Sequence, residues 1–325
     1  MSIVLERAKA TDQARKQSEL KKEGRKQTMD QQEAIREPIR RLRADLRKAA
    51  ATAMSVEEAR YLVDLYYQIQ DFRMASGAEI RAMSKSGEPV TLVDWVSGSM
   101  EAIEAEIKKA LDLYTNAHEM GRWLKNIIGI GPVIAAGLLA HVDVAKTKTV
   151  GGLWRFAGLD PTSQWGKGEK RPWNAKLKVL TWKLGESFVK QSGRPESLYG
   201  HLWAERKKLE TEKNLAGEFA EQAKAALERK RIGKDTEAYL WYSGCLTRKA
   251  AEKILAAPAE KRGAMVKDLA GEPDTGTRML PPGHVHARAK RWAVKVFLCH
   301  YWEEAYRQKY GKEPPEIYSI VMLGH

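Results

Sequence analysis

The stretch WLKNIIGIGPVIAAGLLA, residues 123–140, contains the pattern that decides the predicted fold. Two short apolar segments flank Gly129, Ile130 and Gly131, and the second segment carries its apolar residues at helical spacing. Glycines one residue apart permit a positive φ and a tight reversal between two helices. Pro132 follows at the first position of the second helix, where its missing N–H costs nothing. The sequence therefore predicts a helix-hairpin-helix.

The turn of this helix-hairpin-helix is predicted to bind an anion. A helix N-terminus presents free backbone N–H groups, and its dipole favours negative charge. In a basic protein the expected anion is a nucleic-acid phosphate. We expect Gly131 to be the glycine that the turn requires, in a left-handed conformation. The predicted contacts come from Lys125, Gly129, Ile130, Gly131 and Val133. The alternative is an ordinary turn inside a helical core.

The composition limits the class of protein. The 325 residues suffice for about two or three domains, and a hydrophobic content of 43% allows a sizeable core. The formal net charge of +14 favours nucleic acid or an anionic surface as partner. Cys245 and Cys299 are far apart, which argues against a zinc site or disulfide framework. We find no signal peptide and no apolar run of transmembrane length, and expect a cytoplasmic protein without a membrane partner.

Helical periodicity dominates the remaining sequence, so we expect an all-α fold. Residues 1–50 are predicted to form a charged basic arm, partly disordered or helical. A capping box at residues 55–58 opens a predicted antiparallel helical hairpin at 51–120, which is also the expected surface for a homo-oligomer. The helix-hairpin-helix domain is predicted at 121–190. A helical C-terminal region is predicted at 191–325, with a basic helix near 285–310.

Two further segments carry candidate nucleic-acid contacts. The loop DPTSQWGKGEKRP, residues 160–172, interleaves basic residues with an aromatic one. Lysine and arginine suit phosphates, and tryptophan suits stacking on a base. The expected contacts are Trp165, Lys167, Lys170 and Arg171 in this loop, with Arg288 and Arg291 in the basic helix. The alternatives are a surface loop with a pinned tryptophan and a core helix with solvated cations.

The order of three motifs carries a family resemblance. The run GIGPVIAAGLLAHVD, then WRFAGLDP, then GKGEKRP before a Lys-rich helix resembles the C-terminal domain of the DEDD-type, RNA-guided insertion-sequence transposases. The resemblance covers about residues 102–190. It implies DNA binding and a role in DNA transposition and recombination of a mobile element. The family's RuvC-like N-terminal domain, which holds acidic metal ligands, has no counterpart in the helical, charged residues 1–115.

The resemblance also implies a serine nucleophile in the loop after the AGL-x-P segment. That position falls near Trp165 or Gly166, and Ser163 is the nearby serine. We therefore expect a DNA-binding protein without a cofactor, with RNA as the alternative ligand. A second hypothesis is a strand-transfer enzyme that uses Ser163, Mg²⁺ and a metal-binding half supplied by another chain. A third is a non-catalytic interaction scaffold.

Overall fold

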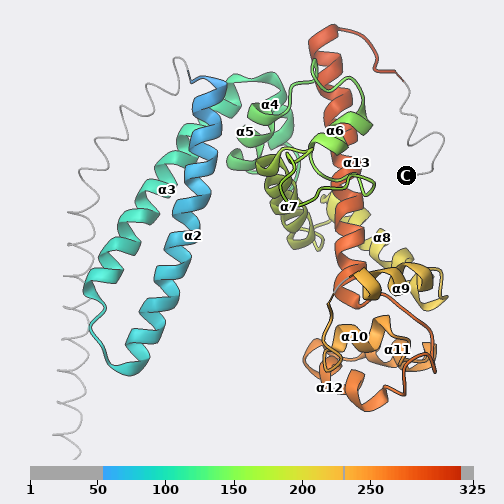
Figure 1. The fold of residues 1–325 in the computed structure, drawn as a ribbon. Coiled ribbons are helices and arrows are strands. Elements are labelled where there is room, and N and C mark those ends of the chain that lie inside the picture. The colour runs from blue at the N-terminus through green and yellow to red at the C-terminus, as the bar shows by residue number, and fades with distance from the viewer. Residues whose placement is uncertain (1–53, 230, 316–325) are drawn as a thin grey trace, which may run out of the picture. The chain divides into compact units, whose positions relative to one another are not determined.

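The computed structural model describes residues 54–229 and 231–315 (Figure 1). This described part contains twelve α-helices and no β-strand, which confirms the predicted all-α fold. The predicted basic arm at residues 1–50 lies outside the described residues. Contacts divide the chain into two compact units. The first comprises the described residues up to Arg122 together with Gly131–His141, and the second comprises Trp123–Ile130 and the described residues from Val142 onward.

Two long helices form most of the first unit. α2 (Val56–Ser86) begins at the predicted capping box: the Ser55 hydroxyl accepts the Glu58 N–H, and the Glu58 carboxylate accepts the Ser55 N–H. Gly87, with a φ of 80°, ends the helix. Figure 1 shows α3 (Thr91–Ala117) running back beside α2 as an antiparallel hairpin. Its exposed apolar side chains include Tyr61, Phe72, Leu92 and Trp95. Self-association through this hairpin stays a prediction.

α5 (Pro132–His141) packs against this hairpin. One apolar cluster joins the three helices, with Ala59, Val63, Ile107, Leu111, Val133, Ala136 and Ala140 among its members. Arg60 Nε donates to the Ala140 carbonyl at 2.7 Å, which adds a polar link between α2 and the end of α5. Ala136 and Ala140 of α5 thus pack closely on α2 and α3.

The turn between α4 (Glu119–Lys125) and α5 differs from the prediction at its second glycine. Gly129 has a φ of 98°, whereas Gly131 is outside the left-handed region and has open space where a Cβ would lie. The expectation of a left-handed Gly131 is therefore wrong. At Gly129 a Cβ would lie 3.3 Å from both Phe188 Cδ1 and Ser187 Oγ, so the required glycine is Gly129. Ser187 Oγ also donates to the Gly129 carbonyl at 2.6 Å.

The second unit is organised around the long helix α13 (Pro282–Tyr310). α6 (Val150–Phe156), α7 (Ala175–Lys190) and α8 (Leu198–Leu215) pack along it. Phe188, Tyr199 and Phe297 form an aromatic group in which neighbouring ring centroids lie 4.9–5.6 Å apart. The other helices of this unit are α9 (Ala220–Arg229), α10 (Glu237–Tyr242), α11 (Arg248–Ala256) and α12 (Ala259–Leu269).

Two further properties bear on the predicted class. Both cysteines are buried and free. Among the helices that the structure describes, none combines the length and the apolar character needed to cross a membrane.

Candidate nucleic-acid interface

The loop that follows α6 is held by folded structure at both ends. Trp154 Nε1 donates to the Lys295 carbonyl at 3.0 Å and fixes α6 on α13. At the far end, the Asn174 N–H donates to the Phe156 carbonyl at 2.9 Å, and the Asn174 side chain caps α7. The predicted basic loop is therefore anchored at its start by α6, which is fixed on α13, and at its end by α7.

Within the loop, Glu169 accepts hydrogen bonds at both its backbone carbonyl and its carboxylate. Trp165 Nε1 donates to the Glu169 carbonyl at 2.7 Å, and the Glu169 carboxylate accepts the Gly166 N–H at 2.9 Å. The side chains of Lys167 and Lys170 are exposed. The glutamate is thus engaged within the loop while both lysines face solvent.

Asp160, at the start of the loop, also has hydrogen-bond and ion-pair partners close by in the sequence. Its carboxylate accepts the Thr162 hydroxyl at 2.6 Å and the Thr162 N–H at 2.9 Å, and it lies 3.1 Å from Arg155 Nε. The hydrogen bonds from Thr162, together with Arg155, hold the pKa of Asp160 below its ordinary value. The second acidic side chain of this segment is thus engaged locally as well.

Aromatic rings and cations alternate from the loop into α7. Arg171 Cζ lies 4.7 Å from the Trp165 ring centroid, and the Trp165 and Trp173 centroids are 6.4 Å apart. Lys178 Nζ lies 4.1 Å from the Trp173 centroid. The Trp165 side chain remains 45% exposed. Such a sequence of rings and cations can stack on bases and pair with phosphates.

Two residues of α13 extend this positive surface. We call Lys178, Arg291 and Lys295 the cation cluster. Partial desolvation lowers the pKa of all three, and Arg291 lowers the pKa of both Lys178 and Lys295 further by like-charge repulsion. None of the ion pairs in the described chain involves a member of this cluster. Asp160 attracts Lys295 and Glu210 attracts Arg291, although neither carboxylate forms an ion pair with them. A bound anion would relieve the repulsion within the cluster.

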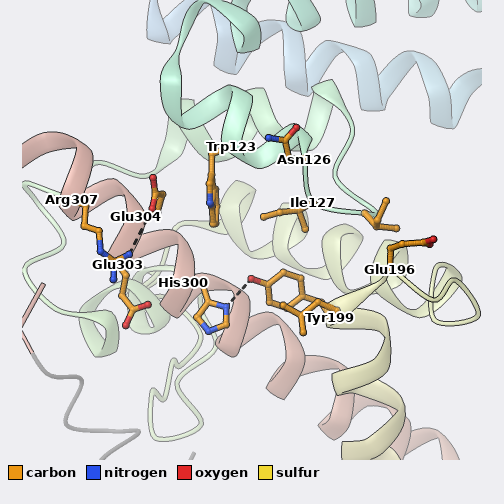
Figure 2. Close-up of a pocket in the computed structure, with 11 residues that line it drawn as sticks. Trp123, Asn126, Ile127, Glu196, Tyr199, His300, Glu303, Glu304 and Arg307 are labelled. Carbon is orange, nitrogen blue, oxygen red and sulfur yellow. Dashed lines mark hydrogen bonds and ion pairs between the residues drawn. The ribbon is translucent and has the colours of Figure 1, made fainter. Parts of the chain in front are cut away.

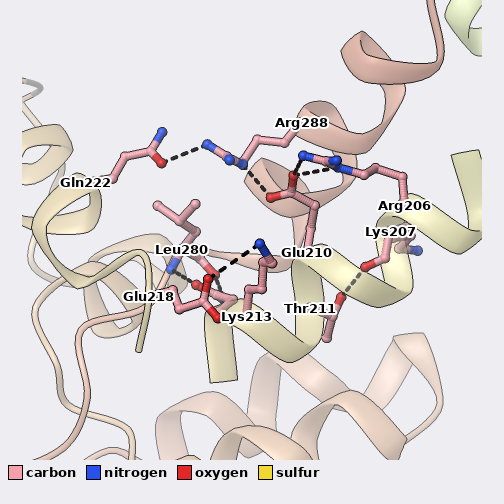
Figure 3. A network of polar contacts seen from close by, with 10 residues as sticks. Arg206, Lys207, Glu210, Thr211, Lys213, Glu218, Gln222, Leu280 and Arg288 are labelled. Atoms are coloured by element: carbon pink, nitrogen blue, oxygen red, sulfur yellow. Dashed lines mark hydrogen bonds and ion pairs between the residues drawn. The ribbon is translucent and has the colours of Figure 1, made fainter. Parts of the chain in front are cut away.

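Arg288, also predicted to contact nucleic acid, uses two of its guanidinium donors within the second unit. Figure 3 shows its guanidinium between Gln222 and Glu210. Arg288 Nε donates to Glu210 and Nη1 to Gln222, each at 2.7 Å. Its Cζ also lies 4.4 Å from the Phe219 ring centroid. These contacts fix α13 to α8 and give Arg288 a structural role, so Arg291 is the predicted cation of this helix that joins the cluster.

Around the helix-hairpin-helix turn, several of the residues predicted to contact an anion are buried or partly buried. The side chains of Ile130 and Val133 are buried, and the Ile130 N–H already donates within the turn. Lys125 is partly buried and Gly131 is exposed. The boundary between the two compact units falls between Ile130 and Gly131. Anion binding at residues 125–133 stays a prediction.

Ser163, the candidate nucleophile, lies partly buried near the start of the loop. Its N–H donates to the Asp160 carbonyl at 3.3 Å. Within the described residues no hydrogen bond joins its hydroxyl to a basic side chain. Over the same residues, no group of three or more His, Cys, Asp or Glu side chains is placed to hold a metal ion. A nucleophilic role for Ser163 stays a prediction.

A cavity of about 440 Å³ in the second unit has the opposite charge. Figure 2 shows Trp123, Tyr199 and His300 on its walls, with the Tyr199 hydroxyl 2.8 Å from His300 Nδ1. Its charged lining consists of Glu196, Glu303, Glu304 and Arg307. Three carboxylates against one guanidinium do not suit a phosphate. This cavity is therefore excluded from the candidate interface.

The sequence predicts the loop as a nucleic-acid contact but does not predict three residues that lie beside it. Trp173, Lys178 and Lys295 were not predicted to take part. Arg291 and Lys295 are four residues apart, so helical spacing could have placed them on one face. No local signal pairs Lys178 with Trp173, because that contact depends on how the loop returns to α7.

Comparisons with protein-family models, with curated proteins and with solved structures found no match for this chain. The resemblance to transposases therefore stays a prediction that rests on the three motifs.

Proposed function

We propose that this protein binds nucleic acid through the loop around Trp165 together with the cation cluster of α7 and α13. The observation that carries the proposal is the cluster's charge. Arg291 repels both Lys178 and Lys295, and no ion pair of the described residues involves any of the three. Backbone phosphates would neutralise these cations and release counterions, which drives association.

The exposed tryptophan supports a ligand with unpaired bases. A base inside a duplex offers no free face to a protein ring, whereas a single strand stacks its bases on aromatic side chains. Trp165 is exposed beside Arg171, so base and phosphate contacts are available within a few residues. DNA is the proposed ligand because of the transposase resemblance, and RNA is the alternative.

A binding panel tests the proposal. Fluorescence anisotropy on the full chain would compare single-stranded, branched and duplex DNA with RNA of the same sequence. We expect single-stranded or branched DNA to bind most tightly. Tighter binding of RNA would identify RNA as the ligand of the same interface. Absence of binding to every member of the panel at low salt would contradict the proposal.

A further inference from the structure

α7 exposes two apolar side chains on the surface of the second unit. Val179 is 51% exposed and Trp182 is 58% exposed. Residues three apart on an α-helix are neighbours on its surface, so we call these two side chains the α7 patch. The core contacts of α7 come from other residues, among them Leu177, Leu184 and Phe188, which are fully buried. The α7 patch is therefore open to a ligand.

The α7 patch lies next to the cation cluster. Lys178 of the cluster precedes Trp182 by four residues, which places both side chains on one side of α7. On α13, Lys290 is adjacent in sequence to Arg291 of the cluster, and its Nζ lies 5.0 Å from the Trp182 ring centroid. A Cβ on Gly185 would lie 2.7 Å from Lys290 Cγ, so this glycine lets α13 approach α7 closely. The two helices thus bring Trp182 and the cations together.

The charges that lie directly beside Trp182 are paired with each other. Lys290 forms an ion pair with Glu186, which follows Trp182 by one helical turn on α7. This pairing neutralises the carboxylate nearest in sequence to the ring and also uses the charge of Lys290. We therefore expect Trp182 to contribute stacking, while the phosphates pair with the cation cluster.

Further aromatic rings lie on the loop side of the cluster. The ring centroids of Trp165 and Trp173 are 6.4 Å apart, and Lys178 Nζ lies 4.1 Å from the Trp173 centroid. Lys178 thus contacts one ring of the loop side and lies one helical turn from Trp182. Exposed rings on both sides of a group of cations suit a single strand, which carries bases and phosphates in alternation along its length.

We propose that a single strand bound at the Trp165 loop continues across the cation cluster and stacks a further base on Trp182. The inference rests on the proposed function and adds a second stacking position to the same interface. It requires a minimum length of strand, because only a strand that reaches both rings gains both stacking contacts. A second copy of this chain is the alternative occupant of the α7 patch, and the experiment below separates the two.

Fluorescence anisotropy of the full chain with oligothymidines of 4 and 16 nucleotides tests the inference, because single-strand sites cover about 4–16 nucleotides. We expect Trp182→Ala to weaken binding of the 16-mer about tenfold, the loss of one stacked base. Binding of the 4-mer should change little, because a short strand can still use Trp165. Trp182→Tyr keeps an aromatic face and should retain most of the affinity. Trp95→Ala, a 51% exposed tryptophan of α3, is the matched control and should bind like the parent.

Thermal melts and sedimentation complete the test. Trp182→Ala should melt close to the parent, because the side chain is 58% exposed. If Trp165→Ala weakens binding of the 16-mer and Trp182→Ala does not, the inference is wrong and the proposed function stands. If Trp182→Ala converts a dimer into a monomer and keeps the parent's affinity for the 16-mer, the α7 patch binds a second copy and the inference is also wrong. If the parent binds neither oligonucleotide at low salt, the proposed function fails and this inference fails with it.

Discussion

Glu210 shows how single residues hold the second unit together. Its side chain is almost fully buried on α8 and accepts from Arg206 Nε at 2.9 Å and Arg288 Nε at 2.7 Å. Burial alone would raise the pKa of this carboxyl, but hydrogen bonds and charges from Arg288 and Arg206 outweigh burial and lower it. The carboxylate is therefore needed in its charged form.

Replacing Glu210 by Gln should destabilise the protein by about 3 kcal/mol, because two guanidinium groups lose their charged partner. The lowered pKa also sets a pH dependence. Its stabilisation is complete above the ordinary carboxyl pKa and is lost as the pH falls through the lowered value of the folded state. Urea denaturation across the acid range should show this loss in the parent and less of it in Glu210→Gln. Glu212→Gln, exposed on the same helix, is the control and should resemble the parent.

The two glycines of the turn after α4 should differ in their tolerance of substitution. Gly129→Ala should lower the free energy of unfolding by about 1–3 kcal/mol, because a non-glycine residue is strained at a φ of 98°. The new Cβ would also meet Phe188 and Ser187 at 3.3 Å. Gly131→Ala should be nearly neutral in the same thermal melt. The opposite order of melting temperatures would disprove this account of the turn.

Among the helices, local sequence signals correctly predicted where some of them begin, because a helix start depends on residues that are neighbours in the sequence. The Ser55 capping box and the proline at the start of α5 both lie where the sequence placed them. Each acts on N–H groups within one helical turn, so its signal is complete in a short segment. The helical periodicity of α2, α3 and α13 likewise predicted the all-α fold.

Contacts between distant segments could not be predicted in this way. The packing of α5 on α2 and α3 depends on where the chain goes after the turn. The ion pair between Arg288 and Glu210 joins residues that are 78 positions apart in the sequence. The sequence shows that Arg288 is basic, but it does not show whether the charge is already paired. For this reason the sequence predicted the loop residues of the candidate interface but not Lys178 and Lys295 on the helices.

The exposed ring of Trp165 is testable as an element of the loop. Trp165→Ala should weaken single-strand binding by about 1–3 kcal/mol through lost stacking. It should change the melting temperature little, because the side chain is 45% exposed and its indole donates only within the loop. Tyr61→Ala, an exposed aromatic on α2, is the control. An affinity for single-stranded DNA equal to the parent's would remove Trp165 from the interface.

At the scale of the whole molecule, a net charge of +14 predicts binding that depends strongly on salt. The logarithm of affinity should fall linearly with the logarithm of salt concentration, by about 0.7 for each single-strand phosphate neutralised. Titrations at several salt concentrations measure this slope. A flat response would mean that charge does not drive binding.

A paired melt and titration of Lys178→Gln/Lys295→Gln tests whether the cation cluster is the nucleic-acid interface. Both lysines have a lowered pKa because they are partly desolvated and close to Arg291. Removing them should relieve repulsion, so the variant should melt at the same or a higher temperature than the parent. Its affinity for single-stranded DNA should fall, and the salt slope should decrease by about 1.4, twice the value for one phosphate.

The control carries the same change of charge on another helix. Lys249→Gln/Lys253→Gln replaces two exposed lysines of α11 that are one helical turn apart, and should bind like the parent. The account predicts that the cluster variant stays folded and loses affinity while the control keeps it. If the folded cluster variant binds single-stranded DNA with the parent's affinity and salt slope, the cation cluster is not the nucleic-acid interface.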